Sequence, residues 1–275
     1  MKKIFIAVLL LAGLLLLPAA AKADLTITPW RVVFEGRTRS ATVELLNMTD
    51  RTNTYRIGWL VPKRNEKTGK IDLTPYVDDK DPHSVAKMVV FSPRQVTIEP
   101  RGHQIIRLSL RRPADLPPGE YRAHLSMIRL AKEKPQKQDP KAKDIEMVLN
   151  VNLGFSIPVI VRSGEDKDLK ISLSSPGLSM STGNKPSPVL DVDINRDAGK
   201  FSSYGSVNVY WAPDQGKEEK IGTMDNIALY PEVQSRHLSI RLKQNPTDGK
   251  IRVVYLGKYE SAGKTWAEKT FPIGK

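Results

Sequence analysis

The segment Ile145-Glu-Met-Val-Leu-Asn-Val-Asn-Leu-Gly-Phe-Ser-Ile-Pro-Val-Ile-Val161 has an apolar residue at every odd-numbered position. Its even-numbered positions are mostly polar or small. Because successive side chains of a strand point to opposite faces, this alternation predicts an extended strand with one continuous apolar face. At about 3.3 Å per residue the segment could reach roughly 55 Å, whereas ordinary strands have about 5 to 6 residues. The core of one small sandwich would not cover that length.

Shorter alternating runs between turn signals occur on both sides of this segment, and helical periodicity is nearly absent, so we expect an all-β protein. The strands expected in the first half are residues 25–34, 40–46, 54–61, 88–91, 94–98, 104–110, 120–130 and 145–161. This is the strand count of an immunoglobulin-like sandwich. The strands expected in the second half are residues 169–173, 189–194, 206–211, 221–224, 227–230, 237–242, 251–258 and 265–273.

Two immunoglobulin-like β-sandwich domains are therefore expected, over residues 24–163 and 168–275, with a short polar bridge at residues 163–167 between them. Two aromatic residues favour a sandwich over a barrel in the first half. Trp59 lies within the third run, where such sandwiches place a core tryptophan. Tyr121 follows Asp-Leu-Pro-Pro-Gly-Glu at the start of the penultimate run, as in a tyrosine corner, and Ala123 stands where antibody domains carry a cysteine.

The first 23 residues have the pattern of a secretory signal peptide. Lys2 and Lys3 precede an apolar run over residues 4–17, and Ala21-Lys22-Ala23 ends the segment, so we expect cleavage before Asp24. The apolar run is shorter than the roughly 20 residues that a membrane-spanning helix needs, so no stable membrane insertion is expected. Cleavage would lower the formal net charge from +13 to +10, because the segment contains three lysines and no acidic residue.

Composition excludes several functional classes. The chain has no cysteine, which rules out disulfides, thiolate metal sites and a cysteine nucleophile. The cations are spread along the chain without a helix-borne stripe, so we expect no nucleic-acid binding and instead solubility and attraction to acidic partners or anionic surfaces. We expect neither an enzyme nor a metal or cofactor, because His83, His103, His124 and His237 show no metal-ligand spacing or catalytic motif, and residues 78–81 (Asp-Asp-Lys-Asp) lack the pattern of a calcium loop.

The long alternating segment has two interpretations. It could form two consecutive strands, or one strand that bridges both domains, and be buried wholly within this chain. Alternatively, it could be an edge strand whose upstream half offers its apolar row to another protein by strand addition. The preceding residues 131–144, Ala-Lys-Glu-Lys-Pro-Gln-Lys-Gln-Asp-Pro-Lys-Ala-Lys-Asp, favour the second interpretation, because a polar loop of this length is usually functional or disordered.

Several blocks of the first half resemble a known family. They are Thr28-Pro-Trp-Arg-Val-Val-Phe-Glu-Gly36, Arg39-Ser-Ala-Thr-Val-Glu-Leu-Leu-Asn47, Phe91-Ser-Pro-Arg-Gln-Val-Thr-Ile-Glu-Pro-Arg-Gly102 and Ile106-Arg-Leu108. In this order they resemble the first domain of the PapD-like periplasmic chaperones of the chaperone–usher pilus pathway, over about residues 25–162. The second half matches that family only in position and β character.

The resemblance implies a boomerang of two domains in the periplasm that lends a strand to a pilin or fimbrial subunit. This donor-strand complementation ends when another subunit replaces the strand at an outer-membrane usher. By alignment of the strand ends, the donor row would be Met147, Leu149, Val151, Leu153 and Phe155.

The resemblance also implies a pair of cations that grip the C-terminal carboxylate of the subunit. Arg31 matches the arginine of that pair, whereas Pro158 stands where the lysine is expected. Either a neighbour such as Arg162 replaces the lysine, or Arg31 and backbone donors suffice, or the client differs from a standard pilin.

Self-association of the free protein through the exposed edge strand is a further expectation. The alternative function is that of a secreted immunoglobulin-like adhesin, or a structural subunit that uses the long strand within its own assembly.

Overall fold

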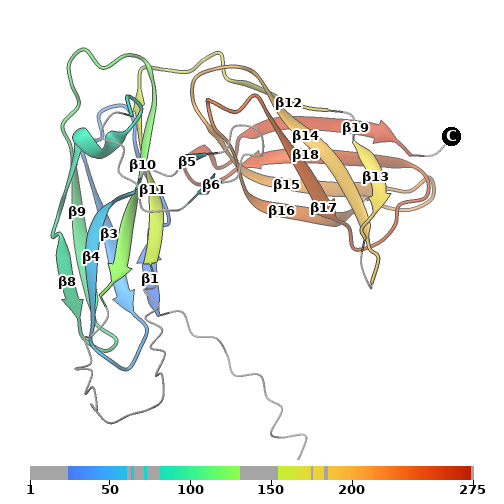
Figure 1. The fold of residues 1–275 in the computed structure, drawn as a ribbon. Coiled ribbons are helices and arrows are strands. Elements are labelled where there is room, and N and C mark those ends of the chain that lie inside the picture. The colour runs from blue at the N-terminus through green and yellow to red at the C-terminus, as the bar shows by residue number, and fades with distance from the viewer. Residues whose placement is uncertain are drawn as a thin grey trace, which may run out of the picture.

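The computed structural model describes residues 24–60, 63–64, 71–72, 81–130, 154–174, 176–182 and 185–273. The described chain is almost entirely β, as predicted, with two single-turn 3₁₀ segments, η1 (Val85–Lys87) and η2 (Tyr259–Ser261). Its strands form two sandwiches that follow one another along the chain, together with a small ladder of β5 (Lys63–Arg64) and β6 (Ile71–Asp72). The expectation of two immunoglobulin-like sandwiches is confirmed (Figure 1).

The first sandwich packs a four-stranded sheet against a five-stranded one. The strands of the four-stranded sheet, in spatial order, are β1 (Leu25–Thr28), β3 (Ser40–Asn47), β9 (His103–Leu110) and β7 (Val89–Ser92). Those of the five-stranded sheet are β2 (Val32–Phe34), β11 (Gly154–Ser163), β10 (Gly119–Arg129), β4 (Asn53–Leu60) and β8 (Gln95–Ile98).

The first predicted strand, residues 25–34, is interrupted, and the prediction of one continuous strand was wrong. Its first part, β1, pairs antiparallel with β3, whereas its second part, β2, pairs parallel with β11 in the opposite sheet. The chain changes sheets after Thr28, where Pro29 has no backbone N–H to continue a ladder. This crossing carries Arg31 to the boundary between the two sheets, beside the second sandwich.

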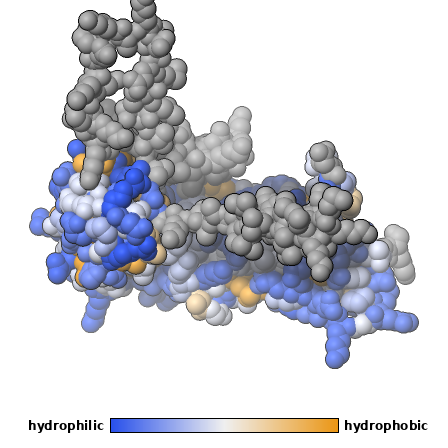
Figure 2. Space-filling model, turned by 90° about the horizontal axis from the view of Figure 1, so that it is seen from below, coloured by the Kyte–Doolittle hydropathy of each residue, from blue (hydrophilic) through white to orange (hydrophobic). Residues whose placement is uncertain are grey.

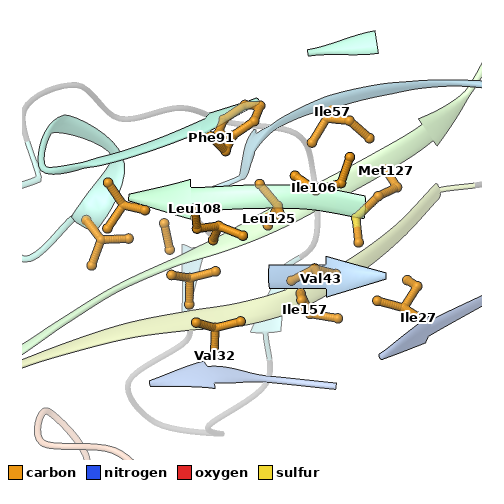
Figure 3. Close-up of a cluster of buried hydrophobic side chains, with 14 of the residues drawn as sticks. Ile27, Val32, Val43, Ile57, Phe91, Ile106, Leu108, Leu125, Met127 and Ile157 are labelled. Carbon is orange, nitrogen blue, oxygen red and sulfur yellow. The ribbon is translucent and has the colours of Figure 1, made fainter. Parts of the chain in front are cut away.

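The core of the first sandwich follows the alternation of its strands. In β3 and β9, Val43, Leu45, Ile106 and Leu108 are buried, and the residues between them are mostly exposed. Figure 3 shows side chains from both sheets, including Val43, Ile106 and Leu125, gathered in one apolar layer. Burial of such side chains contributes about 1.5–3 kcal/mol each, which makes this layer the main source of stability for the sandwich.

The two aromatic predictions have the expected environments. The Tyr121 hydroxyl donates a hydrogen bond to the Pro117 carbonyl oxygen at 3.0 Å, which is the upstream backbone bond of a tyrosine corner. Trp59 is half-buried at the edge of the core and meets Phe91 edge-to-face, with ring centroids 5.4 Å apart.

The second sandwich also has two sheets. One contains β12 (Lys170–Leu173), β14 (Pro188–Ala198) and β13 (Gly177–Met180), with β17 (Ser235–Arg241) paired to β14. The other contains, in order, β16 (Glu219–Leu229), β15 (Ser203–Ala212), β18 (Lys250–Gly257) and β19 (Thr265–Pro272). A separate apolar core lies between these sheets, and Tyr255 is among its fully buried side chains.

Two predictions for the second half were wrong in detail. The two runs 221–224 and 227–230 form the single strand β16, with a register irregularity opposite Gly205 and a left-handed residue, Asn226, at φ 59°. Asparagine tolerates this conformation better than most residues, so the strand continues past it. Strand β13 was not predicted, because all four of its residues are exposed and so lack an apolar alternation.

The two sandwiches extend in different directions from a shared corner (Figure 1), as expected for a boomerang. The chain passes through this corner between the end of β11 at Ser163 and the start of β12 at Lys170. On the face seen in Figure 2 the described atoms are mainly hydrophilic, with small apolar spots. A hydrophilic surface agrees with the high net charge of the chain.

Candidate functional site

Strand β11 has an incompletely paired outer edge. It pairs antiparallel with β10 from Gly154 to Ser163, but β2 pairs with its other side only at residues 159–161. Within the described ranges, no strand therefore covers the outer edge of residues 154–158. An uncovered edge presents backbone donors and acceptors that can pair with another chain.

The odd-numbered row of β11 faces the core of its own sandwich. Ile157, Val159 and Val161 are buried in that core, and Phe155 is half-buried against it. Phe155, the last residue of the predicted donor row, thus lies at the edge of the core, near the first described residue of β11. The other four predicted donor residues, Met147, Leu149, Val151 and Leu153, lie outside the described residues.

Pro158 is half-buried on β11 opposite His124 of β10. It provides neither a cation nor a backbone N–H, so Pro158 itself cannot hold a carboxylate by an ion pair or a hydrogen bond.

Arg31 is buried between the two sandwiches, with its side chain 5% exposed. Its Nη2 donates to Glu260 Oε1 at 2.8 Å, and its guanidinium lies 4.5 Å from the centroid of the Tyr204 ring. Burial is the main cause that raises the pKa of Tyr204 above its ordinary value, with a smaller effect from Tyr259. The ring therefore stays neutral beneath the guanidinium and can make a cation–π contact. The predicted anchor arginine thus already contacts a carboxylate of its own chain.

Arg162 is the second cation at this corner. Its Nη2 lies 3.4 Å from the same Glu260 oxygen, and its Nη1 lies 3.2 Å from Glu35 Oε2. Its guanidinium also donates to Glu120 and to the carbonyl oxygen of Ser202. The structure thus brings together Arg31 and Arg162, the pair considered from the sequence, although Pro158 occupies the lysine position.

Glu120 of the first sandwich is hydrogen-bonded to Ser202 of the second. Its carboxylate is fully buried and accepts hydrogen bonds from the Ser202 backbone N–H at 3.0 Å and the Ser202 hydroxyl at 2.8 Å. It also accepts hydrogen bonds from Arg162 Nε at 3.3 Å and Arg122 Nη1 at 3.2 Å. Four donors around one carboxylate compensate its desolvation, so Glu120 acts as a polar joint between the domains.

A cleft of ≈ 600 Å³ lies between the sandwiches on the side of Arg122. The guanidinium of Arg122 contacts both oxygens of Glu232 at 2.7 and 2.8 Å. Burial alone would lower the pKa of Arg122, but Glu232 and Glu120 outweigh it and raise the pKa above its ordinary value. The lining residues are Asp81, His83, Pro118, Gly119, Glu120, Arg122, His124, Gly199, Lys200, Pro231 and Glu232. Arg122 thus pairs with one carboxylate from each sandwich at this cleft, Glu120 and Glu232.

The four histidines are not assembled into one site. His83 and His124 line the cleft, whereas His103 is exposed on β9 and His237 lies on β17, with Nδ1 2.8 Å from Asp193 Oδ1. Among the described residues, no group of three or more His, Asp or Glu side chains is arranged to hold a metal ion. Asp81, the described residue of the acidic segment 78–81, accepts a hydrogen bond from the His83 backbone N–H at 2.8 Å. None of the helices in the described ranges has the length and apolar character of a membrane span.

Sequence reasoning missed Glu120, Ser202 and Glu260. Glu120 directly precedes the tyrosine-corner residue, and its position at the start of a strand next to the domain corner was the only available signal. Ser202 and Glu260 lie in connections of the second sandwich, and no pattern in the sequence relates them to Arg31 or Arg162.

Neither a scan against protein-family models nor a search of curated proteins finds a match. Among solved structures, the chain is similar to the YadV chaperone, with 15% identity and a TM-score of 0.48 over 91% of this chain and 100% of that one. It is similar to the CupB2 chaperone of Pseudomonas aeruginosa, with 14% identity and a TM-score of 0.43 over 90% and 99% of the two chains. It is also similar to a chain of the CsuC–CsuE chaperone and tip adhesion subunit pre-assembly complex of Acinetobacter baumannii. That match has 16% identity and a TM-score of 0.42 over 91% and 98%.

Proposed function

We propose that this protein is a periplasmic chaperone that binds and stabilises pilin or fimbrial subunits by donor-strand complementation and delivers them to an outer-membrane usher. The main support is the outer edge of β11, which is uncovered at residues 154–158 in a strand whose apolar alternation continues upstream to residue 145. The resemblance of the sequence blocks in residues 25–162 to the PapD-like chaperones supports the same function.

Strand addition suits the chemistry of this segment. Backbone hydrogen bonds along the uncovered edge would provide affinity, and the alternating apolar side chains would fill a groove in the client. At about 1.5–3 kcal/mol for each fully buried side chain, five anchors offer roughly 10 kcal/mol before the cost of ordering both partners. A complex of this strength would persist in solution and could still be exchanged for another subunit.

The arginines at the corner would hold the client's chain end. Arg31 and Arg162 already converge on one carboxylate oxygen, so their guanidinium groups lie close enough to bind a single carboxylate together. A C-terminal carboxylate anchored there would set the register in which the client pairs with the donor strand.

The test is affinity purification of the tagged protein from the periplasm of its own cells, followed by mass spectrometry and sizing. We expect a one-to-one complex with a smaller pilin-like chain. Leu149→Asp or Val151→Asp should abolish this capture with little change in melting temperature, whereas Asn150→Asp adds the same charge on the other face and should retain it. A collapse of the melting temperature in the first two variants would show that the row belongs to the chain's own core.

Arg31→Ala should lower client recovery in the same purification, and unchanged recovery would remove Arg31 from the site. Arg101→Ala is the matched control, because Arg101 pairs with Asp50 on the exposed surface of the first sandwich. Homopolymers of the protein itself, without a smaller partner, would instead indicate the alternative function of an adhesin or structural subunit.

A further inference from the structure

The carboxylate of Glu260 occupies the point where the two arginines converge. Its Oε1 lies 2.8 Å from Arg31 Nη2 and 3.4 Å from Arg162 Nη2, and its side chain is 12% exposed. Both cations belong to the first sandwich, whereas Glu260 belongs to the second. The same atoms that would hold a foreign carboxylate therefore hold one from the protein's own chain.

The loop that carries Glu260 is held in a defined conformation. Glu260 lies in η2, between β18 and β19, where the backbone N–H groups of Ser261 and Lys264 bond to carbonyl oxygens within the loop. A Cβ at Gly257 would overlap the Ser261 carbonyl, so the tight approach of the two backbones requires glycine. Tyr259 has a left-handed backbone, with φ at 55°, which costs a non-glycine residue about 1 kcal/mol or more. The fold thus maintains a strained turn that presents Glu260 to the arginines.

Glu260 does not satisfy Arg31 completely. Arg31 Nε is buried and has no hydrogen-bond acceptor among the described residues, although the Nη2 of the same guanidinium is bonded. Nε and Nη2 form the side of the guanidinium that can bind both oxygens of one carboxylate. An incoming carboxylate that approached this side could therefore make one more hydrogen bond to Arg31 than Glu260 makes.

From these contacts we infer that Glu260 is a placeholder carboxylate, which fills the anchor in the free protein and is displaced by the C-terminal carboxylate of a client. The inference rests on the proposed function and adds an internal competitor to it. Because Glu260 must leave before the client's carboxylate can bind, the apparent affinity for that carboxylate is reduced by the fraction of molecules in which the anchor is filled.

Displacement would also change the contact between the sandwiches. It would break the ion pairs of Glu260 with Arg31 and Arg162 but leave the Glu120–Ser202 and Arg122–Glu232 contacts in place. On client binding the corner would thus lose both ion pairs of Glu260, while the contacts of Glu120 and Arg122 hold the domains together.

The test uses two acetylated peptides of sequence Thr-Val-Thr-Val-Thr-Val, one with a free C-terminal carboxylate and one with a C-terminal amide. Their binding to the whole mature protein is measured by calorimetry. Glu260→Gln keeps the size of the side chain but removes its charge, and it should bind the carboxylate peptide about tenfold more tightly than the unaltered protein does. Binding of the amide peptide should stay unchanged, and adding Arg31→Ala should abolish the gain.

Glu232→Gln is the matched control, because it also removes a carboxylate that pairs with an arginine of the other sandwich, yet it should give no gain. Glu260→Asp, which retains the charge on a shorter side chain, should give a smaller gain and serves as the second variant if Glu260→Gln does not fold. If the folded Glu260 variants bound the carboxylate peptide no more tightly than the unaltered protein does, Glu260 would not be a placeholder. If the unaltered protein still captured its client in that case, the proposed function would stand, whereas absence of capture would refute that function separately.

Discussion

Replacing Glu120 with glutamine should weaken the joint between the sandwiches. The carboxylate accepts four hydrogen bonds, two from Ser202 and one each from Arg122 and Arg162. A glutamine amide has the same shape but only one acceptor oxygen, and its NH₂ group would face a guanidinium donor. Glu120→Gln should therefore keep part of the bonding to Ser202 and lose the bonds to the arginines.

The expected loss of unfolding free energy depends on which carboxylate partners Arg122 and Arg162 keep. Removing one partner of a buried ion pair costs about 3–5 kcal/mol when the other charge is left uncompensated. Here Arg122 keeps both oxygens of Glu232, and Arg162 keeps Glu35 and Glu260. We therefore expect a loss near the lower limit, about 3 kcal/mol.

The assay is urea unfolding followed by tryptophan fluorescence, with small-angle scattering to detect a change in the arrangement of the domains. The matched control is Glu99→Gln, because Glu99 is exposed and accepts one hydrogen bond from Thr52, so its loss should cost less than about 0.5 kcal/mol. If Glu120→Gln were as stable as the control and scattered identically, the carboxylate would not be a joint between the sandwiches.

Three further outcomes follow from individual contacts. Tyr121→Phe removes the hydrogen bond to the carbonyl four residues upstream and should cost roughly 1 kcal/mol in urea unfolding. The hydrogen bond from Ser239 is the main cause that lowers the pKa of Asp191 below its ordinary value. The ionised Asp191 carboxylate therefore stabilises the folded protein above the unfolded-state pKa, and this stabilisation is lost as the pH falls through the folded-state pKa. Asp191→Asn should therefore flatten the acid side of a melting-temperature profile. Gly205→Ala should destabilise the second sandwich by roughly 2 kcal/mol or more, because a Cβ there would overlap the Leu256 carbonyl.

Each of these outcomes has a clear contrary result. Gly177→Ala adds the same methyl group into open space and should be nearly neutral, so equal effects at the two glycines would refute the overlap argument. An unchanged acid profile in Asp191→Asn would show that its hydrogen bonds do not differ between the folded and unfolded states. A Tyr121→Phe protein as stable as the original would mean that the corner's hydrogen bond is replaced by water.

Most of the strands could be predicted from the alternation of apolar and polar residues over a few positions of the chain. Strands β3 and β9 alternate buried and exposed residues over most of their length, so their positions were predicted to within about two residues. The tyrosine corner was predicted because the Pro-Pro-Gly turn and Tyr121 are adjacent in the chain. Strand β13 could not be predicted from alternation, because none of its residues is buried. The change of sheet after Thr28 could not be predicted either, because it depends on the strands with which β1 and β2 pair.

The all-β class, the two sandwiches and the alternating row that ends in β11 could be predicted from the sequence, because they depend on the order of apolar and polar residues along a strand. The convergence of Arg31 and Arg162 on one Glu260 oxygen, and the contact of Glu120 with Ser202, became visible only in the folded chain. Ion pairs and hydrogen bonds act over a few ångströms, and the partners at this corner are 40 to 229 residues apart in the chain. Which charges become partners is therefore set by how the two sandwiches pack, a property that no local pattern encodes.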